Sequence, residues 1–228
     1  MKYLLLIFLT IIVYCCSRTA TEDYSFIDKA FWENLRLASG AENIEISFES
    51  ELETKTMKID FINSNFVYNN FTEYVKVSDS LLTVIFLNSQ IDTSRHNFSI
   101  SFSNGIHKNV NHYTIDEVYS TLGKRKFFEQ DYDNAVVYFD KAIRKNPKNE
   151  VFYFYKATCL HKVKKYKESL ESIKNYFNLK PNGSISSLVL LAKIYRDFND
   201  YQNNKITIDK ILNIDPNVDI SEIQLGNG

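Results

Sequence analysis

The sequence predicts a small α+β domain followed by an all-α solenoid of three helical hairpins. Two patterns lead to this expectation. Apolar and polar residues alternate with a period of two in several segments between residues 44 and 102, which is typical of half-buried strands. Further along the chain, Pro147, Pro181 and Pro216 recur at intervals of 34 and 35 residues. A recurrence of that length indicates repeats of two helices each.

An apolar run at the start of the chain predicts export. Met1–Tyr14 places one lysine before about a dozen mostly apolar residues, which is the length of a signal-peptide core. A membrane-spanning helix needs more, roughly 20 residues. We therefore expect residues 1–17 to act as an export signal.

Two cysteines that directly follow this run predict how the exported chain is held. Cys15 and Cys16 resemble the lipidated cysteine of bacterial lipoproteins, which implies a lipid anchor and a place in the cell envelope. Cys16 fits the pattern better, because the bulky Tyr14 precedes Cys15. The alternatives are cleavage after Ser17 or Ala20, giving a periplasmic or secreted protein, and retention of the segment as an uncleaved anchor.

Residues 23–105 are predicted to form the α+β domain, which begins with a helix. From Ser25 to Ala38, apolar residues recur at helical spacing. Ser25 and Asp28 resemble a capping box at the start of this helix. Gly40 is expected to end it, because glycine readily adopts the left-handed conformation that follows many helices.

The alternating segments predict the strands of this domain. Their polar members are expected on a solvated face and their apolar members on a covered face: Ile44, Ile46, Phe48, Met57, Ile59, Phe61, Phe98, Ile100 and Phe102. Leu81–Leu87 is apolar on both faces and is expected to be a central strand, paired with Tyr74–Val77. We therefore predict one helix on an antiparallel β-meander, followed by a polar linker or domain boundary at residues 104–112.

Residues 114–217 are predicted to hold three repeats, at 116–149, 150–183 and 185–218, with a tail at 218–228. The prolines are accompanied by tyrosines at the same spacing, Tyr132, Tyr166 and Tyr201. Small residues stand where the first helix of each hairpin should approach the second: Gly123, Ala157 and Ala192. This pattern resembles the tetratricopeptide repeat family, in which neighbouring hairpins bury a shared core.

The repeats depart from the family pattern at three positions. Lys156 stands where leucine is usual, and Ser169 and Asn204 stand where alanine is usual. The tail is too short for the polar helix that closes many such stacks. The outer face of the last hairpin is therefore expected to be covered by the tail, by the α+β domain or by a partner.

The resemblance implies a groove along the first helix of each hairpin, and so a protein or extended peptide as the partner. Carried onto this sequence, its lining is Lys124, Phe127, Phe154, Thr158, His161, Lys162, Val189, Lys193 and Arg196. Cations above an apolar floor favour a segment with an acidic and an apolar side chain. Chaperone-binding members clamp a carboxylate with asparagines, and Lys124 and Tyr155 stand at those positions instead. The alternative is that the lining residues are ordinary solvated side chains.

Charge and motifs argue against several other functions. Residues 22–115 carry 7 basic and 13 acidic residues, whereas residues 116–217 carry 18 and 13. That excess is too diffuse to predict nucleic-acid binding. The sequence has no phosphate-binding glycine loop, zinc-protease motif or serine-hydrolase motif, so we expect no enzyme activity, cofactor or metal. Cys159 is expected to be a small buried hydrophobe, and His161 has no acid at catalytic spacing.

The sequence thus favours an exported, lipid-anchored adaptor or scaffold that binds another protein through its helical groove. One alternative is a lipoprotein that assists envelope assembly or secretion, which differs in its partner. A second is an enzyme with its site in the α+β domain, and the missing catalytic motifs disfavour it.

Overall fold

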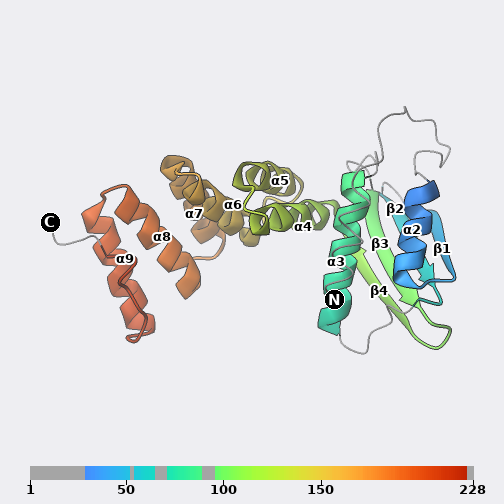
Figure 1. The fold of residues 1–228 in the computed structure, drawn as a ribbon. Coiled ribbons are helices and arrows are strands. Elements are labelled where there is room, and N and C mark those ends of the chain that lie inside the picture. The colour runs from blue at the N-terminus through green and yellow to red at the C-terminus, as the bar shows by residue number, and fades with distance from the viewer. Residues whose placement is uncertain (1–28, 52–53, 65–70, 89–95, 225–228) are drawn as a thin grey trace. The chain divides into compact units, whose positions relative to one another are not determined.

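The computed structural model describes residues 29–51, 54–64, 71–88 and 96–224. Their contacts divide the chain into two compact units, one ending at Val118 and the other beginning at Tyr119. Figure 1 shows a mixed α and β unit followed by a series of helices. The predicted export segment and its two cysteines lie outside the described residues.

The first described helix, α2, spans Lys29–Ser39. It ends as predicted at Gly40, whose φ of 60° places it in the left-handed region. The Gly40 N–H donates to the Leu37 carbonyl at 3.2 Å, and the Ala41 N–H donates to the Arg36 carbonyl at 3.1 Å. These bonds satisfy carbonyls that the helix end would leave without partners. The predicted cap at Ser25 and Asp28 lies outside the described residues.

Four strands form one sheet in the order β1-β2-β3-β4. They are β1 (Asn43–Glu51), β2 (Thr54–Ile62), β3 (His96–Ser103) and β4 (Lys108–Tyr113). The three strands predicted from alternation are confirmed. On β2 and β3 the apolar members of the alternation are buried, with Met57, Ile59, Phe61, Phe98, Ile100 and Phe102 at most 1% exposed.

The predicted meander is wrong, because Leu81–Leu87 and Tyr74–Val77 both lie in one helix, α3 (Phe71–Asn88). Leu81, Leu82 and Ile85 are buried together with Ser78, and these positions recur every three or four residues, which is helical spacing. The helix connects β2 to β3, which pair in parallel. Parallel neighbours require a crossover connection of this kind, so the sheet is mixed.

The predicted linker at residues 104–112 is also wrong, because most of it forms β4, antiparallel to β3. Asn104 shapes the turn: its side-chain oxygen accepts from the N–H groups of Ile106 at 3.1 Å and His107 at 2.8 Å. The last residue of this strand, Tyr113, is buried. There, the Tyr113 hydroxyl donates to Asp79 of α3 at 2.8 Å, and burial followed by the Asp79 charge raises the pKa of Tyr113.

The face of β3 predicted to be solvated is instead covered at two serines. Ser99 and Ser101 are both buried. The Ser101 hydroxyl donates to the Asp60 carboxylate on β2, and Lys108 on β4 forms an ion pair with Asp60 at 3.1 Å. The serines alternate with apolar residues as a solvated face would, but the polar partner of Ser101 lies on the neighbouring strand.

Six helices follow, and they confirm the three predicted hairpins. The pairs are α4 (Ile115–Phe128) with α5 (Tyr132–Lys145), α6 (Glu150–Lys162) with α7 (Tyr166–Leu179), and α8 (Ile185–Asp197) with α9 (Tyr201–Ile214). At the start of α4, the Glu117 carboxylate accepts from the Thr114 N–H at 2.8 Å, which is one half of a capping box.

The turn inside each hairpin repeats one backbone conformation. Gln130, Lys164 and Asn199 stand at matching positions with φ of 62°, 61° and 56°. In each turn, the next N–H donates back across the helix end, as from Lys165 to the Leu160 carbonyl at 2.9 Å. Left-handed residues other than glycine are uncommon, so the recurrence of this conformation marks one hairpin design used three times.

Close contacts between the two helices of a hairpin occur at the predicted small residues. A Cβ atom on Gly123 would lie 3.0 Å from the Phe139 ring. Ala157 and Ala192 are fully buried. The departures from alanine have a role at these contacts: the Ser169 hydroxyl donates to the Ala157 carbonyl at 2.8 Å, and the Asn204 amide donates to the Ala192 carbonyl at 2.9 Å.

Neighbouring hairpins share apolar clusters. Cys159 of the second hairpin packs with Ala135 and Phe139 of the first. Burial raises the pKa of its thiol to about 12, so Cys159 is the small buried hydrophobe that the sequence predicts. Lys156, which replaces a usual leucine, reaches Asp140 of the first hairpin and forms an ion pair at 2.7 Å.

Candidate protein-binding groove

The candidate groove begins with an aromatic and cationic cluster between α4 and α6. The Lys124 ammonium lies 5.7 Å from the centre of the Tyr155 ring. Phe127 meets the same ring edge-on at 5.9 Å, and Tyr155 stacks on Phe139 at 5.4 Å. At Lys124 and Tyr155, where the tetratricopeptide resemblance led us to look for asparagines, the chain has a cation over an aromatic ring.

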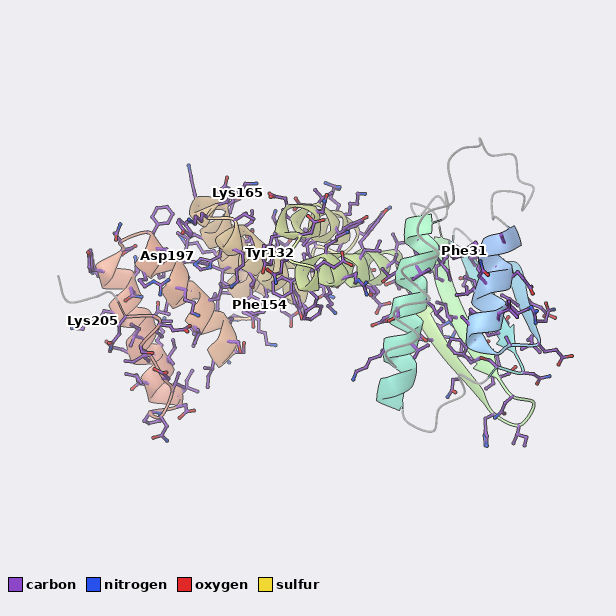
Figure 2. The ribbon with its side chains drawn as sticks, viewed as in Figure 1. Phe31, Tyr132, Phe154, Lys165, Asp197 and Lys205 are labelled. Carbon is purple, nitrogen blue, oxygen red and sulfur yellow. The ribbon has the colours of Figure 1, made fainter. Side chains whose placement is uncertain are left out.

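Phe154 and Thr158, on α6, contribute less to an open surface. Phe154, labelled in Figure 2 among the side chains of the helices, is half-buried. It packs against a cluster that includes Ala157, Ile173 and Leu190. The Thr158 hydroxyl donates to the Phe154 carbonyl at 2.9 Å within the helix. Truncating Phe154 would therefore remove contacts between hairpins as well as a predicted groove side chain.

His161 has an acidic partner that the sequence did not predict. Its Nε2 atom lies 2.7 Å from Asp197 Oδ2, across from α6 to α8. Arg196 donates to the other oxygen of the same carboxylate at 2.7 Å. The expectation that His161 has no nearby acid is wrong, because the acid comes from the following repeat. With a hydrogen bond on one side and Tyr166 beside its ring, His161 joins two hairpins.

The part of the groove on α8 is covered by the chain's own tail. Val189 packs against the cluster that holds Ile223. Lys193 forms an ion pair with the Glu222 carboxylate at 2.7 Å, and Arg196 donates to the Glu222 main-chain carbonyl. Of the three possible covers for the last hairpin, the tail is the one that the structure shows.

The solvent-facing part of the predicted surface lies on α4 and α6. Of the predicted lining on these two helices, Lys162 is exposed. Phe128, which follows the lining residue Phe127 in the chain, is exposed over 74% of its surface. Phe127 meets Phe128 edge-on at 5.6 Å, which extends the aromatic cluster outward. An aromatic side chain in solvent is the kind of surface feature that a protein segment can cover.

Three contributors to this region could not be read from the groove pattern. Tyr155 enters the groove pattern only as a position where some members carry asparagine. Asp197 lies next to a groove position, and Glu222 belongs to the tail. The sequence shows the acidic Glu222 and the aliphatic Ile220 and Ile223 of the tail. Its seat on α8 depends on where the chain turns after Pro216.

Among residues 29–51, 54–64, 71–88 and 96–224, no helix combines the length and apolar character needed to cross a membrane. In the same ranges, no group of three histidine, cysteine or carboxylate side chains is placed to hold a metal ion.

Comparison with a family model agrees with the repeat pattern. A model described as anaphase-promoting complex, cyclosome, subunit 3 matches residues 129–209, from just before α5 into α9 and so less than half of the chain. No curated protein sequence matches this chain. The helical half is thus a stack of helical hairpins that resembles tetratricopeptide repeats.

Several solved tetratricopeptide domains are similar to this half. The first domain of Spaghetti (RPAP3), bound to the HSP90 peptide SRMEEVD, is 17% identical with a TM-score of 0.43 over 45% of this chain and 81% of that one. The TPR2B domain of yeast Sti1, in its pHsp70 complex, is 22% identical with a TM-score of 0.42 over 45% of this chain and 82% of that one. The Arabidopsis OM64 domain is 14% identical with a TM-score of 0.45 over 49% and 93%.

Proposed function

We propose that the helical half binds a segment of another protein along α4 and α6, and so acts as an adaptor or scaffold. The observation that supports this most is the Lys124 ammonium held over the Tyr155 ring beside Phe127. A cation on an aromatic floor offers an ammonium to a carboxylate and a flat apolar surface to the neighbouring side chain.

This chemistry favours a segment that carries an acidic residue next to an aromatic or aliphatic one. The charge of Lys124 and Lys162 should mainly raise the association rate, whereas a side chain buried against Phe127 and Phe128 should slow dissociation. Because Lys124 and Tyr155 replace the expected asparagines, the groove is proposed to take an internal segment rather than a terminal carboxylate.

Charge reversal tests this proposal. Lys124→Glu combined with Lys162→Glu should lower capture of the partner from cells at least tenfold. Interfacial charges of the wrong sign cost several kcal/mol of binding free energy, and about 1.4 kcal/mol corresponds to a tenfold change in affinity. The readout is affinity purification after crosslinking in intact cells, with the circular dichroism melt of each variant.

The matched control changes the charge equally on the second helices of two hairpins, with Lys167→Glu and Lys205→Glu. Both side chains are exposed, on α7 and α9. Capture should be retained in this control. Equal loss in both variants would show a nonspecific charge effect, and equal retention would remove α4 and α6 from the interface. Recovery of a membrane-insertion machine as the partner would favour a role in envelope assembly.

Export and lipid anchoring are part of the same proposal and rest on the sequence of residues 1–17. If Cys16 or Cys15 is acylated, the chain should incorporate labelled palmitate and partition into detergent. Replacing both with serine should abolish both properties. A soluble chain that begins near Arg18 or Thr21 would instead show ordinary signal cleavage.

A further inference from the structure

The tail of the chain turns back onto the third hairpin. Ile223 is 1% exposed and lies among Leu188, Ala192, Ile208 and Ile211 of α8 and α9. Val218 and Ile220 pack around the same cluster. One isoleucine side chain thus fills an apolar space that the last hairpin would otherwise leave open.

Polar groups of the hairpin bind the tail around this isoleucine. Lys193 pairs with the Glu222 carboxylate at 2.7 Å, and Arg196 donates to the Glu222 main-chain carbonyl. On the other side, the buried Asn204 amide donates to the Ile223 carbonyl at 2.9 Å. At the Glu222–Ile223 pair, the hairpin therefore contacts one acidic side chain, one buried apolar side chain and two consecutive main-chain carbonyls.

A cover for an apolar end needs none of these polar contacts. Solenoid ends are closed by any element with a polar outer face. Here, Val189, Lys193 and Arg196 are positions that the tetratricopeptide resemblance assigns to ligand contact. Lys193 and Arg196 bind the tail directly, and Val189 packs against the cluster that holds Ile223. Side-chain and main-chain contacts to two consecutive residues are what recognition of a peptide segment requires.

We infer that α8 and α9 form a second segment-binding seat, specific for an acidic residue followed by a branched aliphatic residue, which the Glu222–Ile223 pair fills within the same chain. A partner protein that carries the same pair occupies this seat by displacing the tail. The inference extends the proposed function to the third hairpin, and it has its own test because the seat and the α4–α6 surface have different linings.

The tail is placed to be displaced. The Glu222 side chain is 76% exposed, so its pair with Lys193 is open to exchange with solvent. Ile223 is the fully buried side chain of the segment, whereas Val218 and Ile220 are only partly buried. Tethering gives the tail a high effective concentration, typically in the millimolar range for a short linker. A partner therefore enters the seat only when its affinity and concentration together outcompete the tethered tail.

The test uses the full chain and a labelled peptide with the tail sequence from Asn217 to Gln224. Glu222→Lys with Ile223→Asp in the chain releases the tail from its seat. Fluorescence anisotropy should then show saturable binding of the peptide, about tenfold or more tighter than binding to the unaltered chain, in which the tail competes. The probe is thus a separate copy of the tail segment that fills the seat in the chain.

Charge exchange gives the specificity control. Lys193→Glu in the released-tail chain should weaken binding of the peptide severalfold, and a peptide with Glu222→Lys should recover it. Lys124→Glu with Lys162→Glu, added to the released-tail chain, should leave peptide binding unchanged. Loss of partner capture without loss of peptide binding therefore separates the α4–α6 surface from this seat.

Two results would overturn the inference. One is a released-tail chain that keeps its helical circular dichroism and does not bind the peptide. The other is peptide binding that ignores the charge of residue 193. If the double substitution unfolds the last hairpin, Ile223→Ala alone decides: the folded chain must bind the peptide more tightly than the unaltered chain, and equal affinity rejects the seat.

Discussion

Buried polar side chains hold the two helices of a hairpin together at single positions. Ser169 on α7 and Asn204 on α9 each donate to the carbonyl of the small residue opposite, Ala157 or Ala192. The equivalent residue of the first hairpin is Ala135, which only packs. Asn204 also binds the Ile223 carbonyl, so one amide joins two helices and the tail.

Replacing that amide should be costly. Asn204→Ala removes two buried hydrogen bonds, and each contributes about 1 kcal/mol, so unfolding should become easier by about 2 kcal/mol. Urea denaturation followed by circular dichroism measures this change. Asn213→Ala, at an exposed position of the same helix, should alter the stability by less than about 0.5 kcal/mol. Equal effects of the two substitutions would contradict the bonding role of Asn204.

Residue roles within a repeat were more predictable than roles between repeats. Gly123, Ala157 and Ala192 were identified because close helix contacts demand small side chains at a fixed spacing. The bond from His161 to Asp197 was missed, because the sequence pattern defines positions within one hairpin and says little about which side chains meet across two. The polar contacts of the tail were missed for the same reason.

At the scale of elements, length and flanking residues separated correct from incorrect predictions. The six helices of the second half were predictable, since three periods of the same pattern support each other. Leu81–Leu87 was misread because a short apolar run fits a buried strand and a buried helix equally well. The buried face of this helix includes Ser78, and the periodicity of apolar residues cannot reveal the burial of a polar one.

Enlarging the side chain at Ala157, where α6 approaches α7, tests the repeat register most directly. Ala157 is fully buried between α6 and its neighbours, and its carbonyl accepts from Ser169. Ala157→Leu should overpack this contact and lower the stability by about 1–3 kcal/mol. The thermal melt of the variant should shift down accordingly. A melt like that of the parent would mean that the register is wrong, and Val151→Leu at an exposed position of α6 provides the matched control.

At the scale of the molecule, the chain joins a mixed α/β unit to a stack of three hairpins that closes itself with its tail. The sequence predicted both halves and their order. It could not predict the parallel β2–β3 pair, which depends on α3, or the seat of the tail, which depends on the turn after Pro216. The candidate surface on α4 and α6 then remains as the solvent-facing part of the predicted groove.

The central claim, that this surface holds a protein partner, is tested most directly by photocrosslinking from single positions in living cells. A photoreactive amino acid replaces Phe128 on α4, which is 74% exposed, or Val137 on α5, which is 49% exposed. The account predicts a discrete protein adduct from position 128, its loss when Lys124→Glu is added, and no such adduct from position 137. An adduct from position 137 alone, or none from position 128 in a folded chain, would contradict it.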